Sequence, residues 1–315
     1  MNKIKLGIST CLLGENVRWN AGHKLDRYLS QTLGQFVEYV PVCPEVEAGF
    51  GVPRESMRLV GDPKFPRLIT FKSKEDRTNQ MLNWAKKRVK QLENENLCGF
   101  IFKSDSPSSG MVNVKVYTDK GIPVKKGIGI FANEFMVHFP LIPTEDDGRL
   151  HNPEIRENFI ERIFALKRWR ETLSEKKGMG SLVEFHSRNK LLILSHSPKH
   201  ASQLGKLVGI GKTITTGKLF SQYEMLLMEA LSLKTTTKKN LNVLQHIMGY
   251  FKKQLTGDEK QELLEIFDQY RNGFVPLVVP ITLINHYVRK YNQPYLKMQT
   301  YLNPHPVELK LRTHV

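Results

Sequence analysis

The sequence predicts an α/β fold: an N-terminal open Rossmann-like sheet with flanking helices, followed by an all-α C-terminal domain. Short, almost continuously apolar runs at residues 4–10, 36–42 and 97–103 are typical of parallel strands buried on both faces. An amphipathic segment separates the last two runs. Beyond residue 155, apolar residues recur at helical spacing nearly to the end of the chain.

The amphipathic segment, residues 73–97, carries lysines and arginines on much of one face. Its apolar residues recur at three- and four-residue spacing: Met81, Trp84, Ala85, Val89 and Leu92. This pattern predicts a helix that crosses over between two parallel strands. In an open sheet of this kind, ligands bind in the crevice at the carboxyl ends of the strands.

A domain boundary is predicted in residues 142–155, which are acidic and contain two prolines and a glycine. The 315 residues also exceed a typical single domain, so we expect two compact units, 1–160 and 161–315.

Five helices are predicted in the second half, at residues 157–173, 220–233, 241–255, 259–272 and 281–292. The fourth has Thr256 three residues before Glu259, a sequence typical of a capping box. Pro276 and Pro280 should break the chain before the fifth.

The charge balance indicates a polyanionic partner. Lys and Arg number 47 against 31 Asp and Glu, a net charge of +16, of which residues 1–150 carry +5 and residues 151–315 carry +11. Nucleic acid fits this excess, with a negatively charged membrane surface as the alternative. The chain has no long apolar run and no signal-peptide pattern, so we expect a cytoplasmic protein that does not enter the membrane.

The three cysteines are too few for a disulfide framework, which leaves free thiols, buried hydrophobic residues or metal ligands. Cys11 follows the first predicted strand, Cys43 ends the second, and the turn SPSSG, residues 106–110, follows the third. All three should therefore lie along one sheet edge. Cys98 is predicted inside the third strand, as a small buried hydrophobic residue.

Three segments, residues 11–24, 41–55 and 103–110, together resemble the 2-thiouracil desulfurase (TudS-like) family, and the resemblance spans about residues 1–160. It implies a [4Fe-4S] cluster held by three cysteines, with the fourth iron open to the sulfur of a thiolated uracil. Cys11 and Cys43 match two of these ligands. Ser109 occupies the third position, because the family has SPSCG there, and a serine hydroxyl is a poor iron ligand.

Three interpretations of Ser109 follow. In the first, Ser109 is an engineered Cys→Ser substitution that inactivates the enzyme. In the second, the cysteine has been lost naturally in a protein that only binds RNA. Alternatively, Cys98 supplies the third thiolate, which would require it to leave the core.

The resemblance also implies two catalytic residues. Glu45 would act as general acid/base and activate the water that attacks the thiocarbonyl carbon, and Ser106 would relay a proton or hydrogen-bond the base. From the residues alone, Glu45 is also compatible with a plain loop carboxylate. Glu47 is the second candidate carboxylate, and Ser108 is assigned to the turn.

Segments within residues 180–312 resemble the YbgA-like helical domain, which occurs alone or fused behind a TudS-like domain. Fused proteins of this kind look like desulfurases of 4-thiouridine in tRNA, so the resemblance implies tRNA as the partner and no obligate protein partner. Six basic residues near predicted helix ends are candidates for phosphate contacts: Lys238, Lys239, Lys252, Lys253, Arg289 and Lys290. Four rings beside them would stack on bases or belong to the core: Tyr250, Phe251, Tyr287 and Tyr291.

Two other functions stay open at this point. The first is desulfuration of a free thiolated base or nucleoside. The second is RNA binding without catalysis, by a protein in which Ser109 indicates a site that no longer holds a cluster. A small neutral substrate needs no basic binding surface, so the positive charge of the second half argues against the first of these functions.

Overall fold

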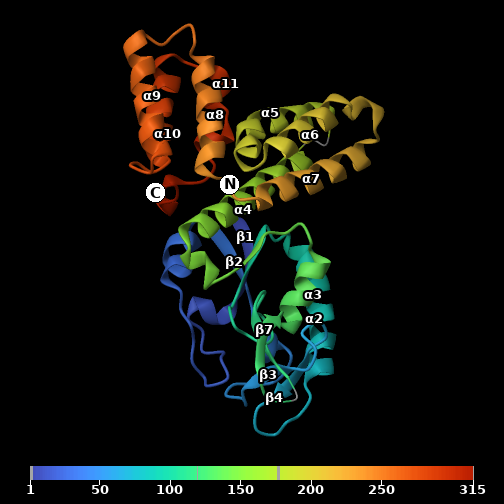
Figure 1. The fold of residues 1–315 in the computed structure, drawn as a ribbon. Coiled ribbons are helices and arrows are strands. Elements are labelled where there is room, and N and C mark those ends of the chain that lie inside the picture. The colour runs from blue at the N-terminus through green and yellow to red at the C-terminus, as the bar shows by residue number, and fades with distance from the viewer. Residues whose placement is uncertain (1–2, 119, 176–177, 315) are drawn as a thin grey trace. The chain divides into compact units, whose positions relative to one another are not determined.

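The computed structural model describes residues 3–118, 120–175 and 178–314, and the chain divides into two compact units, Met1–Asn152 and Pro153–Val315 (Figure 1). No helix within the described residues is both long enough and apolar enough to cross a bilayer.

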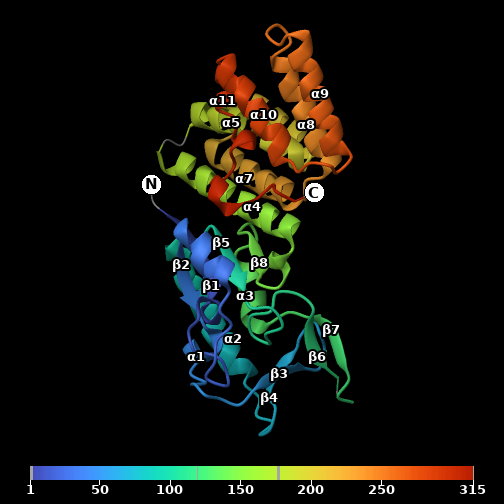
Figure 2. The same ribbon diagram turned by 90° about the vertical axis from the view of Figure 1, so that its left-hand side faces the viewer.

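The first unit contains the predicted parallel sheet, in the order β2-β1-β5-β8 (Figure 2). Its strands are β1 (Ile4–Ser9), β2 (Val37–Val42), β5 (Gly99–Phe102) and β8 (Thr144–Asp146). The chain adds β2 on one side of β1 and then β5 on the other side. The crevice between β1 and β5 is thus the point where the strand order reverses, and ligands bind at such points.

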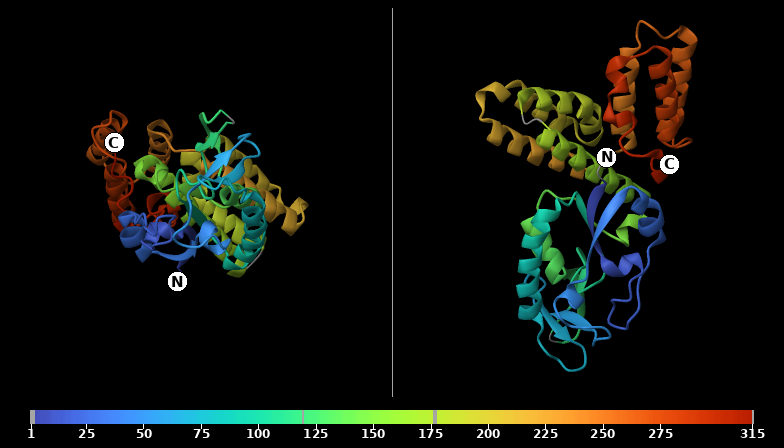
Figure 3. Two further views of the ribbon diagram at one scale, coloured as in Figure 1. Left: turned by 90° about the horizontal axis from the view of Figure 1, so that it is seen from below. Right: turned by 180° about the vertical axis from the view of Figure 1, so that it is seen from behind.

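Two helices pack on this sheet, α2 (Thr78–Leu92), which is the predicted crossover helix, and α3 (Ile130–His138). They lie side by side in Figure 1 and in the right-hand view of Figure 3. Between helices and sheet lies an aromatic core in which Phe100 contacts Phe102, Phe131 and Phe135. A Cβ at Gly7 would lie 2.1 Å from the Phe100 ring, so β1 requires glycine at that position.

A second four-stranded sheet, β4-β3-β6-β7, was not predicted. Its strands are β3 (Met57–Val60), β4 (Arg67–Thr70), β6 (Val114–Tyr117) and β7 (Pro123–Gly127). They are short, and polar residues interrupt them, so their sequences lack a continuous apolar signal. β8 was also missed, because its acidic sequence Thr-Glu-Asp resembles a linker.

The second unit is helical, as predicted. Its helices are α4 (Pro153–Glu175), α5 (Met179–His196), α6 (Pro198–Gly209), α7 (Thr216–Ser232), α8 (Thr237–Tyr250), α9 (Gly257–Arg271), α10 (Val278–Lys290) and α11 (Pro294–Lys297). The predicted capping box is confirmed, with Thr256 and Glu259 each hydrogen-bonding the other's backbone amide. Pro280 does not precede the next helix but is the third residue of α10, where the first turn leaves backbone N–H groups without helical partners.

A buried ion-pair cluster fastens the C-terminal segment to the helices of this unit. Arg312 donates to Oε1 of Glu161 (2.6 Å) and to the carbonyl of Tyr301 (2.6 Å), while its backbone amide donates to Glu157 (3.0 Å). The other oxygen of Glu161 lies 3.1 Å from Nε2 of His196. Arg312, Glu161 and His196 are all nearly inaccessible to solvent, so each charge depends on its protein partners.

Candidate active site

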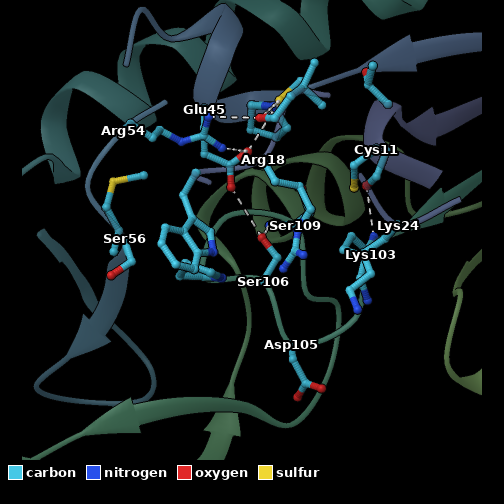
Figure 4. A pocket seen from close by; sticks show the side chains of 18 of the residues that line it. Cys11, Arg18, Lys24, Glu45, Arg54, Ser56, Lys103, Asp105, Ser106 and Ser109 are labelled. Atoms are coloured by element: carbon cyan, nitrogen blue, oxygen red, sulfur yellow. Dashed lines mark hydrogen bonds and ion pairs between the residues drawn. The ribbon is translucent and has the colours of Figure 1, made fainter. Parts of the chain in front are cut away.

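The three predicted strand ends surround one cavity of about 470 Å³ (Figure 4). Cys11 lies in a short 3-10 helix, Thr10–Leu13, directly after β1, and Cys43 lies between β2 and the short helix α1 (Pro44–Glu47). The SPSSG turn follows β5. Cys11, Cys43, Glu45, Ser106 and Ser109 all line the cavity. The tertiary structure therefore brings the predicted site residues together.

Ser106 organises the SPSSG turn. Its hydroxyl accepts hydrogen bonds from the backbone amides of Ser108 (3.3 Å) and Ser109 (3.1 Å). The carbonyls of Pro107 and Ser108 accept from amides in the first turn of α3, which secures the turn against the helix. A Cβ at Gly129 would lie 2.5 Å from the carbonyl carbon of Ser108, so this close approach needs glycine.

Ser108 was assigned to the turn, and its hydroxyl does lie 3.0 Å from that of Ser106, but its side chain also faces Glu45. The fully buried Ser108 hydroxyl donates to Oε1 of Glu45, while Ser106 Oγ is 3.5 Å from the same oxygen. The other carboxylate oxygen lies 3.7 Å from Nη2 of Arg54 and 3.7 Å from Sγ of Cys43. Glu45 is thus a mostly buried carboxylate, held by a hydroxyl and a guanidinium and directed at the cavity.

Glu47, the second candidate carboxylate, has a structural role. Its Oε1 accepts the backbone amide of Cys43 at 2.9 Å, and its Oε2 pairs with Nε of Arg88 at 3.0 Å. These contacts fix the start of α1, and Glu47 does not line the cavity.

Both cavity thiols are stabilised in their protonated form. Burial, and next the negative charge of Glu45, raise the pKa of Cys11 to about 11 and that of Cys43 to about 12. The positive charges of Lys103 and Arg18 partly oppose the rise at Cys11. A bound cation that replaced the two protons would neutralise the thiolates and relieve this penalty.

Cys98 lies at the opposite end of the sheet. It precedes β5 by one residue rather than lying inside the strand, it is 2% exposed, and its amide donates to the carbonyl of Lys5. Its burial was predicted correctly. Because Cys98 does not line the cavity, it is not available as a third ligand there.

The donor set at the cavity consists of two thiols and one hydroxyl. Ser109 is 3% exposed and lines the cavity with Cys11 and Cys43. In the part of the chain that the structure describes, no group of three or more His, Cys, Asp or Glu residues is placed to hold a metal ion.

The six basic residues predicted to contact RNA differ in their surroundings. All but Lys239 are exposed: Lys238, Lys252, Lys253, Arg289 and Lys290. Lys239 donates to the carbonyls of His196 and Lys234, and Lys290 pairs with Glu259.

Two of the four candidate stacking rings belong to the core. Phe251 and Tyr287 are buried, and Tyr291 donates its hydroxyl to Glu259. Tyr250 is exposed and stacks on Tyr295 at a centroid separation of 5.0 Å.

Sequence reasoning gave no role to three residues that line the cavity, Arg18, Trp19 and Lys24, and it did not foresee the contact of Ser108 with Glu45. The first three belong to the segment 11–24, of which only Cys11 was given a role. Their signal was their position shortly after a strand end, which places them at the crevice edge.

Two family models match the chain, one in each half. Residues 190–306 match a family of proteins of unknown function, DUF1722, and residues 6–147 match the 2-thiouracil desulfurase family. The chain is 33% identical over 157 residues to the uncharacterized protein YbgA of Escherichia coli. These aligned residues cover 50% of this chain and 93% of YbgA. The chain belongs to the YbgA family.

This YbgA-family protein is also 30% identical over 108 residues to the uncharacterized protein YbbK of Bacillus subtilis, covering 33% of this chain and 71% of YbbK. One similar solved structure is that of the [4Fe-4S]-dependent thiouracil desulfidase TudS. It is 24% identical, covers 47% of this chain and 94% of its own, and has a TM-score of 0.39.

The Ser108 hydroxyl should stabilise the site measurably. We expect Ser108→Ala to lower the free energy of unfolding by about 1.5–3 kcal/mol, because it removes a buried hydrogen bond to a charged group. Ser73→Ala is the matched control, since Ser73 makes the same type of contact to Glu55 on the surface, and should cost under about 1 kcal/mol. Urea denaturation measures both variants. Equal losses would show that Ser108 does not hold Glu45.

Proposed function

We propose that this chain is a [4Fe-4S]-dependent desulfurase that removes sulfur from thiolated uridine in tRNA, with 4-thiouridine as the substrate. The observation that carries the proposal is the convergence of two buried thiols, a buried hydroxyl and a carboxylate on one cavity. These residues lie within the segment that matches the 2-thiouracil desulfurase family.

The donor chemistry fits an iron-sulfur cluster at two of its three protein positions. Cys11 and Cys43 are buried soft ligands whose protons iron would replace. Ser109 stands at the third position with a harder oxygen donor, which would hold iron weakly. When bound, the cluster supplies a Lewis-acidic iron that attracts a soft sulfur atom.

The chain's own residues would handle the proton and the water. Replacing C=S by C=O consumes one water, whose oxygen bonds to the ring carbon, and releases sulfur as hydrogen sulfide, so no oxidant or reductant is needed. Glu45, held by Ser108 and Arg54, would accept the proton of the attacking water. Ser106 lies next to the same oxygen and would pass a proton onward.

The tRNA part of the proposal is supported by charge. Residues 151–315 carry +11 of the net +16, and five of the six predicted basic residues are exposed. Each phosphate that they neutralise would release counterions, which makes binding depend on salt. The target nucleotide would have to be extruded from the folded RNA to reach the cavity.

Glu45→Gln tests the catalytic role. In a Ser109→Cys background reconstituted without oxygen, we expect sulfide release from 4-thiouridine tRNA to fall about 10²–10⁴-fold, because the general base is lost. Glu55→Gln is the matched control, since Glu55 also lines the cavity but accepts backbone amides of the loop after β4. It should stay within about threefold of the parent.

Substrate comparison separates the proposal from its alternatives. Activity on free 2-thiouracil without activity on tRNA would contradict the tRNA substrate and favour a base desulfurase. Salt-sensitive tRNA binding without desulfuration, even with cysteine at position 109, would favour a non-catalytic RNA-binding protein.

A further inference from the structure

A second cavity, of about 880 Å³, lies within the helical unit and shares no residue with the candidate active site. It is formed by α4, by α5 and by the segment after α11. Its volume is in the range of pockets that hold small molecules. Four charged side chains line it: Arg168, Glu171, Glu184 and Arg188.

One of these four charges has no ionic partner. Arg188 pairs with Glu184 at 2.6 Å, and Glu171 pairs with Lys167 at 3.4 Å. Among the described residues, no acidic side chain forms an ion pair with Arg168. The cavity therefore contains one positive charge that the protein does not neutralise at close range.

The side chain of Arg168 hydrogen-bonds through one nitrogen only. Its Nη1 donates to the carbonyl of Pro304 at 2.9 Å, whereas Nε and Nη2 are buried and have no hydrogen-bond partner among the described residues. Nε and Nη2 lie on one edge of the planar guanidinium, and a carboxylate accepts this pair of N–H groups side-on. Burial lowers the pKa of Arg168 to about 10, the direction expected for a cation without a counter-charge. An anion at this edge would supply two acceptors and the counter-charge.

A buried acceptor lines the same cavity. Asn189 is 3% exposed and donates through Nδ2 to the carbonyl of Phe185 at 2.8 Å, while its Oδ1 has no partner among the described residues. Buried polar atoms are almost always hydrogen-bonded, and a partner of Oδ1 must be a donor. A simple anion cannot satisfy both groups, because Arg168 needs an acceptor and Asn189 needs an N–H or O–H.

The charge of the cavity favours a carboxylate over a phosphate. One positive charge without a partner matches the single negative charge of a carboxylate, whereas a phosphate monoester carries about −1.5 to −2. The start of α5 adds polar backbone, since Met179 and Gly180 line the cavity in the first turn, where N–H groups have no helical partner.

We propose that this cavity binds a small carboxylate that also carries a hydroxyl or ammonium group, with the carboxylate on Arg168 and the donor on Asn189. The site is separate from the proposed desulfurase chemistry. It gives a ligand to the second unit, most of which matches a family of unknown function.

Calorimetric titration of the chain as it stands, with three ligands of similar size, tests this proposal. Lactate carries both groups, propionate lacks the donor, and lactamide lacks the charge. We expect lactate to bind about fivefold more tightly than propionate, because propionate leaves Asn189 unpaired. Lactamide should not bind at concentrations up to about 10 mM. Alanine replaces the hydroxyl by an ammonium, so its affinity relative to lactate identifies the preferred donor.

Matched variants assign the two contacts. Arg168→Lys keeps the charge but loses the side-on pair of N–H groups, and should weaken lactate binding about tenfold or more. Arg188→Lys is its control in the same cavity; because Arg188 already pairs with Glu184, binding should change less than about twofold. Asn189→Ala should abolish the preference for lactate over propionate. Asn158→Ala, which removes a similar amide-to-carbonyl hydrogen bond outside the cavity, should retain it.

Three results would overturn the proposal. The first is no binding of lactate or alanine up to about 10 mM. The second is an equal loss in Arg168→Lys and Arg188→Lys, with circular dichroism showing both variants folded. The third is inorganic phosphate that binds more tightly than lactate and depends on Arg168, which would contradict the carboxylate.

Discussion

Replacing Ser109 with cysteine should raise the iron bound after anaerobic reconstitution to about four atoms per chain, with a brown colour, while the serine form binds far less. Ser109 lines the same cavity as Cys11 and Cys43, and a thiolate is a much better iron ligand than a hydroxyl. The change exchanges one oxygen for sulfur at a buried position, so circular dichroism should show the fold preserved.

Two controls make the iron measurement specific. In the Ser109→Cys background, Cys11→Ser should return the iron content to the level of the serine form. Cys98→Ser should leave it unchanged, because Cys98 lies at the other end of β5. A full cluster in the serine form would contradict the requirement for a third thiolate, and no gain in iron with cysteine at position 109 would contradict the cluster site.

Arg312→Ala should lower the free energy of unfolding of the second unit by about 3–5 kcal/mol. The variant leaves Glu161 and Glu157 buried without their cationic partner and releases the C-terminal segment from Tyr301. Urea denaturation followed by the fluorescence of the buried Trp169, in a background with Trp19 and Trp84 replaced by phenylalanine, reports on this unit.

An exposed ion pair of the same unit provides the comparison. Arg271 pairs with Asp268 with both side chains more than half exposed, so Arg271→Ala should cost about 0.5 kcal/mol or less. Similar losses for the two arginine variants would show that burial of the Arg312 cluster contributes little.

Much of the fold follows from local signals. The strands β1, β2 and β5 are short apolar runs, and α2 and the predicted helices of the second unit repeat their apolar residues at helical spacing. The second sheet and β8 lack such signals. Their stability comes from a few inward-facing residues, such as Leu59, Leu68 and Val116, that meet only after the chain has folded.

The sequence by itself determined that two cysteines and a serine-rich turn follow three strands that share one edge, and that the second half is helical and basic. Only the tertiary structure decided which hydroxyl serves which purpose. Ser106 and Ser108 are equivalent as residue types, but the backbone of the turn directs Ser106 at its own amides and Ser108 at Glu45, which lies 63 positions away in the sequence. Such a contact depends on strand order and loop packing, and a local sequence pattern contains no information about either.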